Sequence, residues 1–315
     1  MKTHAMESKM TGWIIYSKED VEKNKHYIHM YEEKFKEYDV TVKLAVINSQ
    51  REPDRIIFFD YPDEPGDFTH FDYLEQSKLP DFAINRSRNA KVAEKLEKAG
   101  VRVFNSSKVT EIANNKGKTY EFLKDTVPFL LVKYGKYTIV SQIDGKHFKY
   151  PYIIKSCSGH GGSQVFLVND IQQEKDAIDS IKKSGKNNEY IVQQCCSDLG
   201  KDVRVYIIGN KIIKAVLRTS TESFKSNYSL GGRVEEYELN SREKDMVNAI
   251  AKKLPLDYAG IDFTFHNGMA VFNEIEDAVG ARMLYKVSDI DIVQQYVDYI
   301  ITVSYTHLTL PTIRL

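Results

Sequence analysis

Three glycines and a lysine in the segment 150–168 (YPYIIKSCSGHGGSQVFLV) have the types and spacing of a phosphate-binding hairpin. Two short apolar strands are expected on either side of a loop that contains Gly159, Gly161 and Gly162. Glycines leave backbone N–H groups open to an anion because no Cβ blocks the approach, and Lys155 at the end of the first strand adds a positive charge. A glycine-rich turn beside a surface lysine fits the same residues, so this segment alone leaves both interpretations open.

Two familiar phosphate loops are excluded by single residues. The tripeptide 117–119 (GKT) ends like a P-loop, but that motif requires a glycine at position 112, where the chain has Ile112. The loop at 159 begins like the G-x-G-x-x-G of protein kinases, yet Gln164 replaces its last glycine and neither H-R-D nor D-F-G follows. A nucleotide bound at this loop would therefore need a different scaffold.

Three carboxylates on a second predicted hairpin form another group that could do chemistry. Strands are expected at 258–265 and 269–276, joined by a tight turn that brings Asp262 beside Glu274 and Glu276. The two glutamates share one face because side chains alternate along a strand. Three carboxylates on one face repel unless a cation lies between them, and Mg²⁺ prefers oxygen ligands. The sequence therefore predicts a metal site, and a solvent-facing acidic strand is the alternative.

The elements that would position these groups fall into two domains. Residues 12–110 alternate between short strands and helices, which predicts a small open α/β domain. The expected strands are 13–16, 40–47, 56–59, 82–84 and 101–104, and the expected helices cover 27–38 and 90–98. Ligands of such domains bind where strands end, so Arg86 and Arg88 are candidate carboxylate-binding residues. Solvated arginines at the start of a helix are the alternative.

Residues 111–301 are expected to form a second domain with two lobes, one around 125–190 with the glycine loop and one around 191–301 with the carboxylates. Its first expected elements are a helix at 111–124, a strand-rich part at 129–168 and a helix at 170–183, whose inward residues are Ile171, Ala177, Ile178 and Ile181. A strand at 190–194 and a hairpin at 203–218, with Gly209-Asn210 at its tip, follow. The last expected elements are a helix capped by Asn240 and Glu243 and a helix at 289–300.

Composition limits the class of protein. The 315 residues include 44 Lys and Arg against 44 Asp and Glu, so the formal net charge is zero. This balance argues against a surface built to coat nucleic acid or an anionic membrane. No apolar run has transmembrane length, and no signal peptide is recognisable. Partners that are nucleic acids or membranes are therefore not expected.

Cysteine usage indicates a reducing compartment. Cys157, Cys195 and Cys196 form no C-x-x-C motif, so we expect packing residues in a cytoplasmic protein.

The C-terminal segment 303–315 (VSYTHLTLPTIRL) differs in its residue pattern from the rest of the chain and resembles the translation of a transposon sequencing adapter. We therefore expect a non-native tail there.

The motifs occur in an order that resembles the ATP-grasp superfamily, specifically the RimK-like amino-acid (glutamate) ligases. These motifs are the glycine hairpin with Lys155, VQQ, KDVRVYIIG, FKSNYSLGG and D…E-x-E. The resemblance covers residues 80–301 well. It implies an α/β chain of the α+β ATP-grasp type, in which a small N-terminal domain precedes a two-lobed domain. ATP would lie between the lobes, with Mg²⁺ or Mn²⁺ as the metal.

The same resemblance assigns roles to matching positions. Lys116, in the segment 115–120 (NKGKTY), and Lys155 would grip ATP, and the strand ending at Cys195 would line the adenine. The implied nucleotide-binding residues are Lys116, Lys155, Gly159, His160, Gly161, Gly162, Gln193, Gln194, Cys195 and Asp202. The implied catalytic residues are Arg204, Arg218, Lys225 and Asn227, and the implied metal ligands are Asp262, Glu274 and Glu276.

Two departures from the family pattern stand out. The family usually ends its metal motif E-x-N-x-x-P-G, whereas this chain has Glu276 at the asparagine position and continues as DAVGAR. A glutamate still binds Mg²⁺, with one more negative charge, and the changed loop affects the substrate more than the chemistry. Asn115 in place of the usual aspartate is a smaller departure.

The resemblance implies a two-step reaction. A substrate carboxylate attacks the γ-phosphate of ATP, and an amine then attacks the resulting acyl phosphate to give an amide. The substrates would be small-molecule or peptide carboxylates and amines, and a homo-oligomer is left open. Two alternatives remain: an ATP-grasp enzyme with a non-amine acceptor, and a nucleotide-binding sensor or partner subunit without turnover.

Overall fold

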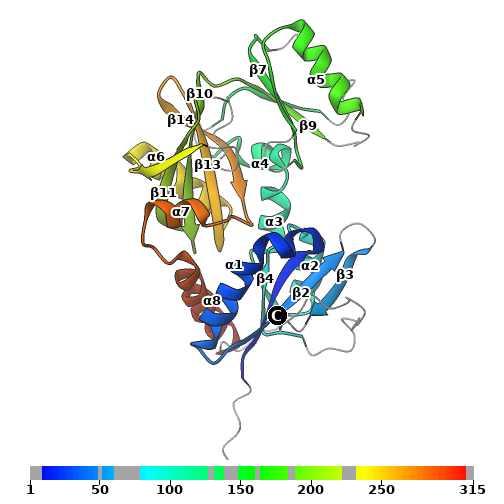
Figure 1. Ribbon diagram of the computed structural model, residues 1–315, viewed down its shortest axis with the longest axis vertical. Helices are drawn as coiled ribbons and strands as arrows, with labels where there is room; N and C mark the ends of the chain where they lie inside the picture. The colour runs from blue at the N-terminus through cyan, green and yellow to red at the C-terminus, as the bar shows by residue number, and fades with distance from the viewer. Residues whose placement is uncertain are drawn as a thin grey trace, which may run out of the picture. The chain divides into compact units, whose positions relative to one another are not determined.

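The alternating strands and helices of the N-terminal segment build a five-stranded sheet in the computed structural model of the protein (Figure 1). The structure describes residues 9–48, 52–59, 79–126, 131–137, 148–159, 164–183, 189–221 and 232–309. The chain divides into two units, residues 1–110 with 291–315 and residues 111–290, and each is described by itself.

Unit 1 holds this sheet, whose strand order is β3-β2-β1-β4-β5. The strands are β1 Thr11–Ser17, β2 Thr41–Asn48, β3 Glu52–Phe59, β4 Phe82–Asn85 and β5 Arg102–Phe104. β2, β1, β4 and β5 run parallel, whereas β3 is antiparallel to β2. Helix α1 (Lys18–Lys36) connects β1 to β2, and α2 (Ala90–Lys98) connects β4 to β5. This is the open α/β arrangement that the sequence predicts.

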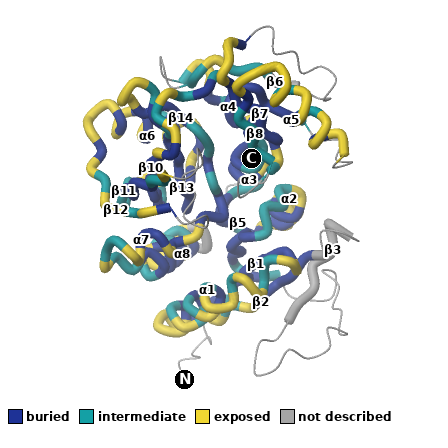
Figure 2. The backbone as a smooth tube through the Cα atoms, turned by 45° about the horizontal axis from the view of Figure 1, so that its top comes forward, coloured by how far each residue is buried: buried dark blue, intermediate teal, exposed yellow. Residues whose placement is uncertain are grey.

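Alternation along the strands of unit 1 buries side chains on both faces of its sheet. On one face Trp13 and Ile15 join Leu96 of α2 in an apolar cluster. On the other face Phe82 packs against Phe35 of α1, with ring centroids 5.3 Å apart. Figure 2 shows β1 and β5 as largely buried, whereas α1 and α2 carry exposed stretches.

The last helix belongs to unit 1 rather than to the second domain in which the sequence placed it. α8 covers Ile292–Thr309 and packs on α1 and β5. Its Tyr296 ring contacts Tyr31 and its Tyr299 ring contacts Phe104, with centroids 6.1 Å apart in both pairs. The helix also continues to Thr309, inside the segment expected to be a tail. The two segments that form unit 1 are therefore far apart in sequence, which a domain boundary drawn by linear order misses.

The described residues of unit 2 form two antiparallel sheets. The smaller sheet has the order β6-β9-β7-β8 and carries α5 against one face (Figure 1). Its elements are β6 Tyr134–Tyr137, β7 Tyr152–Ser156, β8 Val165–Val168, α5 Ile171–Lys183 and β9 Tyr190–Gln194. Ala177 and Ile181 of α5 are buried as predicted, but Ile171 is 57% exposed, so its predicted inward position is wrong. Ile171 begins the helix, where the chain has just left the sheet.

The larger sheet of unit 2 has the order β12-β11-β10-β13-β14. Its strands are β10 Asp198–Ile208, β11 Lys211–Thr219, β12 Arg233–Tyr237, β13 Tyr258–His266 and β14 Met269–Glu276, and its helices are α6 Ser241–Lys253 and α7 Arg282–Val287. Gly209 and Asn210 have φ angles of 54° and 65°, as a primed hairpin turn requires. Asn240 and Glu243 form the predicted capping box of α6.

The helix expected at 111–124 is two helices, α3 (Ser107–Ala113) and α4 (Lys116–Leu123). Asn115 caps α4, because its side chain accepts a hydrogen bond from the Lys118 N–H at 3.0 Å. The backbone N–H of Lys116 donates instead to the carbonyl of Cys157, at 2.8 Å. The break thus brings Lys116 to the end of β7. Among the described residues, no helix is long and apolar enough to cross a membrane.

Candidate active site

Two buried lysines reach the same strand, β14, from two different elements. Lys116 begins α4, and its Nζ donates to the carbonyl of Gly159 at 2.7 Å and lies 3.0 Å from the Glu274 carboxylate. Lys155 lies in β7, and its Nζ donates to Asn273 Oδ1 at 2.8 Å. Both lysines predicted from the sequence therefore converge on adjacent residues of one strand.

The ammonium group of Lys155 is shielded from solvent. Only 5% of Lys155 is exposed. Burial lowers the pKa of its ammonium to about 8, although the Glu274 carboxylate acts in the opposite direction. An anionic ligand beside a buried ammonium of lowered pKa stabilises the charged form and raises that pKa again. Such a group is suited to contact a phosphate.

The glycine loop enters the described structure only at its two ends. Gly159 packs closely, since a Cβ there would lie 3.2 Å from both Ser156 Cβ and Gln164 Oε1. The Ser156 N–H donates to the carbonyl of Gln164 at 3.1 Å, which closes the hairpin between β7 and β8. Five residues predicted for the site lie outside the described residues: His160, Gly161, Gly162, Lys225 and Asn227.

The three predicted carboxylates lie together on the larger sheet. Asp262 of β13 is directly opposite Glu274 of β14 in the strand register, and Glu276 is two residues further along β14. Asp262 is fully buried, whereas about a third of each glutamate side chain is exposed. The hairpin therefore places these side chains as the alternation predicts.

Two arginines bind the buried carboxylate. Arg204 donates from Nε and Nη2 to the two oxygens of Asp262, each at 2.7 Å, and Arg218 donates from Nη2 to the same group, also at 2.7 Å. Burial alone would raise the pKa of Asp262, but the two guanidinium groups outweigh burial and lower it to about 2. Asp262 is thus ionised at any physiological pH.

Each arginine also has a second acidic partner. Arg218 donates from Nε and Nη2 to Asp202 at 2.5 and 2.6 Å, and Arg204 Nη1 lies 2.6 Å from Glu276 Oε2. Asp202, predicted as a nucleotide contact, thus binds Arg218. The sequence identified the members of this network without indicating that the arginines bind the carboxylates.

The donor chemistry of the three carboxylates fits a hard divalent cation. In the structure, however, each is paired with a basic side chain: Asp262 with both arginines, Glu274 with Lys116, and Glu276 with Arg204. Among the residues the structure describes, no three acidic, histidine or cysteine side chains form a ready-made metal site. A metal at this position would have to replace basic partners.

The strand predicted to line the adenine borders the same site. Gln193 and Cys195 are buried, and the Tyr120 hydroxyl lies within hydrogen-bonding distance of Gln193 Oε1, at 3.4 Å, and of the Phe272 carbonyl, at 3.1 Å. The N–H of Gln194 donates to the Lys133 carbonyl at 2.8 Å. Burial raises the pKa of the Cys195 thiol to about 11, as expected for a packing residue.

Sequence reasoning missed two residues of this site. Gly260 lies beside Arg204, because a Cβ at this position would come within 3.2 Å of Arg204 Cδ and 2.9 Å of Val279 Cγ2. Asn273 contacts Lys155 and precedes Glu274. Asn273 carries no local signal, whereas a glycine inside a predicted strand, as at Gly260, is a recognisable sign of close packing.

The two arginines predicted in unit 1 have different surroundings. Arg88 donates to Asp20 at 3.1 Å and has a φ of 59°. Arg86 is 4% exposed, with its guanidinium 5.2 Å from the centroid of the Tyr27 ring. The alternative of a solvated arginine is therefore wrong for Arg86.

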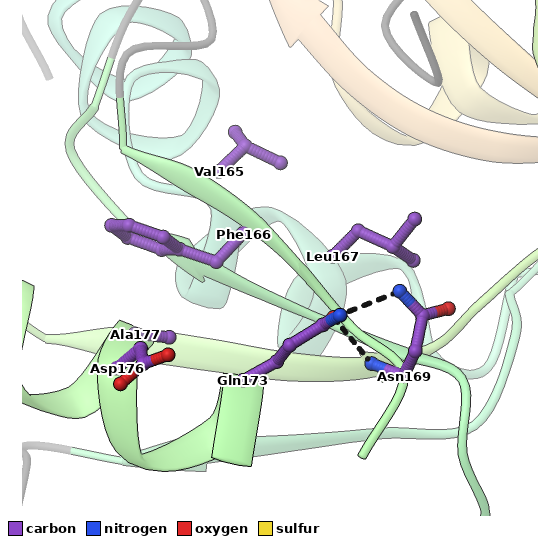
Figure 3. A pocket seen from close by; sticks show the side chains of 7 residues that line it. All are labelled: Val165, Phe166, Leu167, Asn169, Gln173, Asp176 and Ala177. Carbon is purple, nitrogen blue, oxygen red and sulfur yellow. Dashed lines mark hydrogen bonds between the residues drawn. The ribbon is translucent and has the colours of Figure 1, made fainter.

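A groove with other lining residues lies on the smaller sheet of unit 2 (Figure 3). It has a volume of about 470 Å³ and is mostly apolar. Its lining residues come from β8, from the turn after it and from the first half of α5: Val165, Phe166, Leu167, Asn169, Gln173, Asp176 and Ala177. None of the residues predicted for the site lines this groove.

Comparison with known proteins places the chain among characterised sequence families. Residues 113–300 match the model of the RimK-like ATP-grasp domain. The MG011 homolog of Mycoplasma pneumoniae is 31% identical over 87% of this chain and 86% of its own length. A probable alpha-L-glutamate ligase of Haemophilus influenzae is 27% identical over 80% of this chain and 83% of its own length.

Solved structures show the same fold. The D-alanine–D-alanine ligase of Bacillus anthracis, solved with ATP, matches with a TM-score of 0.70 and 16% identity over 94% of this chain and 98% of the other. The ATP-grasp ligase PsnB, solved with a variant of a minimal precursor, Mg and ADP, matches with a TM-score of 0.63 and 17% identity over 94% of this chain and 99% of the other. By its matching family model and its relatives, the chain belongs to the family of RimK-like ATP-grasp ligases.

Proposed function

We propose that this protein joins a carboxylate to an amine at the expense of ATP, through an acyl-phosphate intermediate. The observation that carries the proposal is the convergence of two buried lysines, Lys116 and Lys155, on the strand that holds Glu274 and Glu276. Cationic groups for phosphates and carboxylates for a metal therefore meet in one unit. A solved neighbour that binds ATP, and another that binds Mg and ADP, support this assignment.

In this proposal the lysines and the glycine loop hold the nucleotide. Lys155 and Lys116 contact the phosphates, and Gly159, His160, Gly161 and Gly162 cover them. Gln193, Gln194 and Cys195 lie along the adenine. Asp202 contributes by holding Arg218, because both of its oxygens already accept hydrogen bonds from that guanidinium.

Asp262, Glu274 and Glu276 are the proposed metal ligands, for Mg²⁺ or Mn²⁺. The metal would offset the negative charge of the phosphates. The chain's own part is an exchange of partners: Glu274 leaves Lys116, and Lys116 then turns from a carboxylate to a phosphate. Neither the carboxylate nor the ammonium is left uncompensated when nucleotide and metal arrive together, so the exchange avoids the cost of an unpaired buried charge.

The proposed chemistry needs no covalent bond to the protein. A carboxylate oxygen of the substrate attacks the γ-phosphorus, and ADP leaves. An amine nitrogen then attacks the carbonyl carbon of the acyl phosphate, inorganic phosphate leaves, and the nitrogen loses a proton. Arg204 and Arg218, with Lys225 and Asn227, would stabilise the transferring phosphoryl group, because fixed donors act strongly on charge that develops in a site closed to water.

The reaction can be tested by ADP release from MgATP with a pool of amino acids and short peptides, followed by product mass. We expect ADP release that needs both a carboxylate and an amine, with a product mass equal to their sum less one water. The Glu274→Gln variant should lose at least about 100-fold in turnover, because a misplaced γ-phosphate reacts slowly. Nucleotide binding without ADP release from any pool would favour the sensor alternative. ADP release without an amide product would favour another acceptor.

A further inference from the structure

Strand β14 is irregular at the point where it meets the two lysines. In its pairing with β13, Glu274 is opposite Asp262, but the next pair in register is Phe272 with Phe263. Asn273 is therefore an extra residue on β14, and the strand pair has a β-bulge there. Bulges re-aim side chains next to active sites at the expense of regular pairing.

The consequence of the bulge is that two consecutive side chains serve the same site. In a regular strand, neighbouring side chains point to opposite faces of the sheet. Here Asn273 Oδ1 accepts a hydrogen bond from Lys155 Nζ at 2.8 Å, and Glu274 Oε2 lies 3.0 Å from Lys116 Nζ. Each nucleotide lysine thus has its own partner on β14, one neutral and one charged.

We propose that Asn273 is a positioning residue of the nucleotide site, which holds the Lys155 ammonium toward the phosphates through its side-chain oxygen. This inference rests on the proposed function, in which Lys155 contacts ATP. Asn273 would act through Lys155 and would not itself take part in phosphoryl transfer.

The chemistry of the two groups explains why an amide suits this position. A lysine ammonium has three donor hydrogens, and only 5% of Lys155 is exposed. A fixed protein acceptor therefore replaces a hydrogen bond that the ammonium would otherwise make to water. The Asn273 oxygen supplies that acceptor without a formal charge. The ammonium keeps its full positive charge for the phosphates, which a carboxylate at 273 would partly cancel.

The contact also joins the two sheets of unit 2, since Lys155 is on β7 and Asn273 is on β14. A purely structural role for Asn273 is therefore the competing explanation. The two explanations differ in whether Asn273 affects nucleotide binding when Lys155 is absent, and in whether a charged isostere is tolerated.

The test uses calorimetry with Mg²⁺ and a non-hydrolysable ATP analogue on the full chain. The variants are Asn273→Ala, Asn273→Asp, Lys155→Met and the Asn273→Ala/Lys155→Met pair, with Met269→Ala as the control. Met269 begins the same strand, pairs with His266 in the register and is 53% exposed. Thermal unfolding of each variant reports on folding separately.

We expect Asn273→Ala to weaken binding about 10-fold or more, as loss of a hydrogen bond to a buried charge does. In the Lys155→Met background the same substitution should add little, because the two residues act as one unit. Asn273→Asp has nearly the same shape, so it should keep the melting temperature while it weakens binding. Met269→Ala should bind as the wild type does.

Three results would overturn the inference: wild-type affinity in Asn273→Ala, wild-type affinity in Asn273→Asp, or additive losses in the double variant. If Asn273→Ala fails to fold, Asn273→Asp carries the test. A failure of the proposed function is distinguishable, because it would appear as absent nucleotide binding in the wild-type protein and not only in the variants.

Discussion

Arg204 and Glu276 form an ion pair, with 2.6 Å between Nη1 and Oε2, while the remaining donors of the same guanidinium bind Asp262. One arginine thus compensates two of the three carboxylates on the sheet. Glu276 is the residue that replaces the asparagine of the family pattern, so the added negative charge has a partner in this chain. The glutamate at position 276 is therefore compatible with a metal site whose net charge resembles that of the family pattern with asparagine.

The first prediction concerns the charge of Glu276. Glu276→Gln should raise the Mg²⁺ concentration needed for half-maximal ADP release by about 10-fold, because the variant offers the metal one neutral oxygen in place of a carboxylate. Activity should return in part at high Mg²⁺, since Asp262 and Glu274 remain. A Mg²⁺ titration of the initial rate measures this.

Glu236→Gln is a matched control for this prediction. Glu236 lies on β12 and pairs with Lys214, away from the carboxylate group. Its variant should keep the wild-type Mg²⁺ dependence. An unchanged Mg²⁺ titration in Glu276→Gln would show that residue 276 is not a metal ligand and serves Arg204 alone.

The second prediction is that nucleotide and metal bind cooperatively. In the structure Lys116 is paired with Glu274, so a nucleotide that arrives alone would separate Lys116 from a carboxylate and leave that carboxylate without its cation. Removal of divalent metal with EDTA should therefore weaken binding of a non-hydrolysable ATP analogue by at least about 10-fold. Calorimetry with and without Mg²⁺ measures the effect, and equal affinities would contradict the exchange of partners.

The local parts of the fold could be predicted from the sequence, because their causes lie within a few residues. The turn at Gly209-Asn210 follows from two residues that tolerate positive φ, and the capping box of α6 follows from Asn240 and Glu243. The hairpin that carries Asp262 opposite Glu274 follows from strand alternation and a short turn. These signals also identified the candidate site.

The features that were missed depend on partners far along the chain. The break before α4 is stabilised by the hydrogen bond from the Lys116 N–H to Cys157, and α8 joins unit 1 through contacts with Tyr31 and Phe104. The bulge at Asn273 was not predicted, because the extra residue shows only in the pairing of β14 with Phe263 of another strand. In each case tertiary contacts decide the outcome.

The third prediction concerns pH. Burial lowers the pKa of Lys155 from its ordinary value to about 8 in the free protein. Its ammonium is therefore charged below about pH 8 and neutral above it, and affinity for the ATP analogue should fall as the pH rises from 8 to 9.5. Bound phosphates raise this pKa again, so binding near pH 8 should take up protons.

Calorimetry in buffers of different ionisation enthalpy measures this proton uptake. Within the described part of the chain, the charged or titratable groups that act on Lys155 are Lys116, Glu274, Cys157 and Cys196. Lys155→Arg separates their effects from that of Lys155, since a guanidinium stays charged over the whole range. Its affinity, although lower, should not show the same fall above pH 8. A flat profile in the wild type would contradict a phosphate contact by Lys155, as would unchanged affinity in Lys155→Met.

The last prediction concerns the packing that holds Arg204 in place. A Cβ added at Gly260 would lie 2.9 Å from Val279 Cγ2 and 3.2 Å from Arg204 Cδ, so Gly260→Ala forces at least one of these side chains to move. Overpacking of this kind costs about 1–3 kcal/mol in the free energy of unfolding, which urea denaturation measures. Because Arg204 binds both Asp262 and Glu276, its displacement should also lower turnover by about 10-fold or more.

Gly280→Ala is the matched control for stability, since a Cβ there meets no atom within 4 Å, and its unfolding curve should match that of the wild type. If Gly260→Ala loses stability but keeps full turnover, Val279 yields to the new methyl group and Arg204 keeps its place between the two carboxylates.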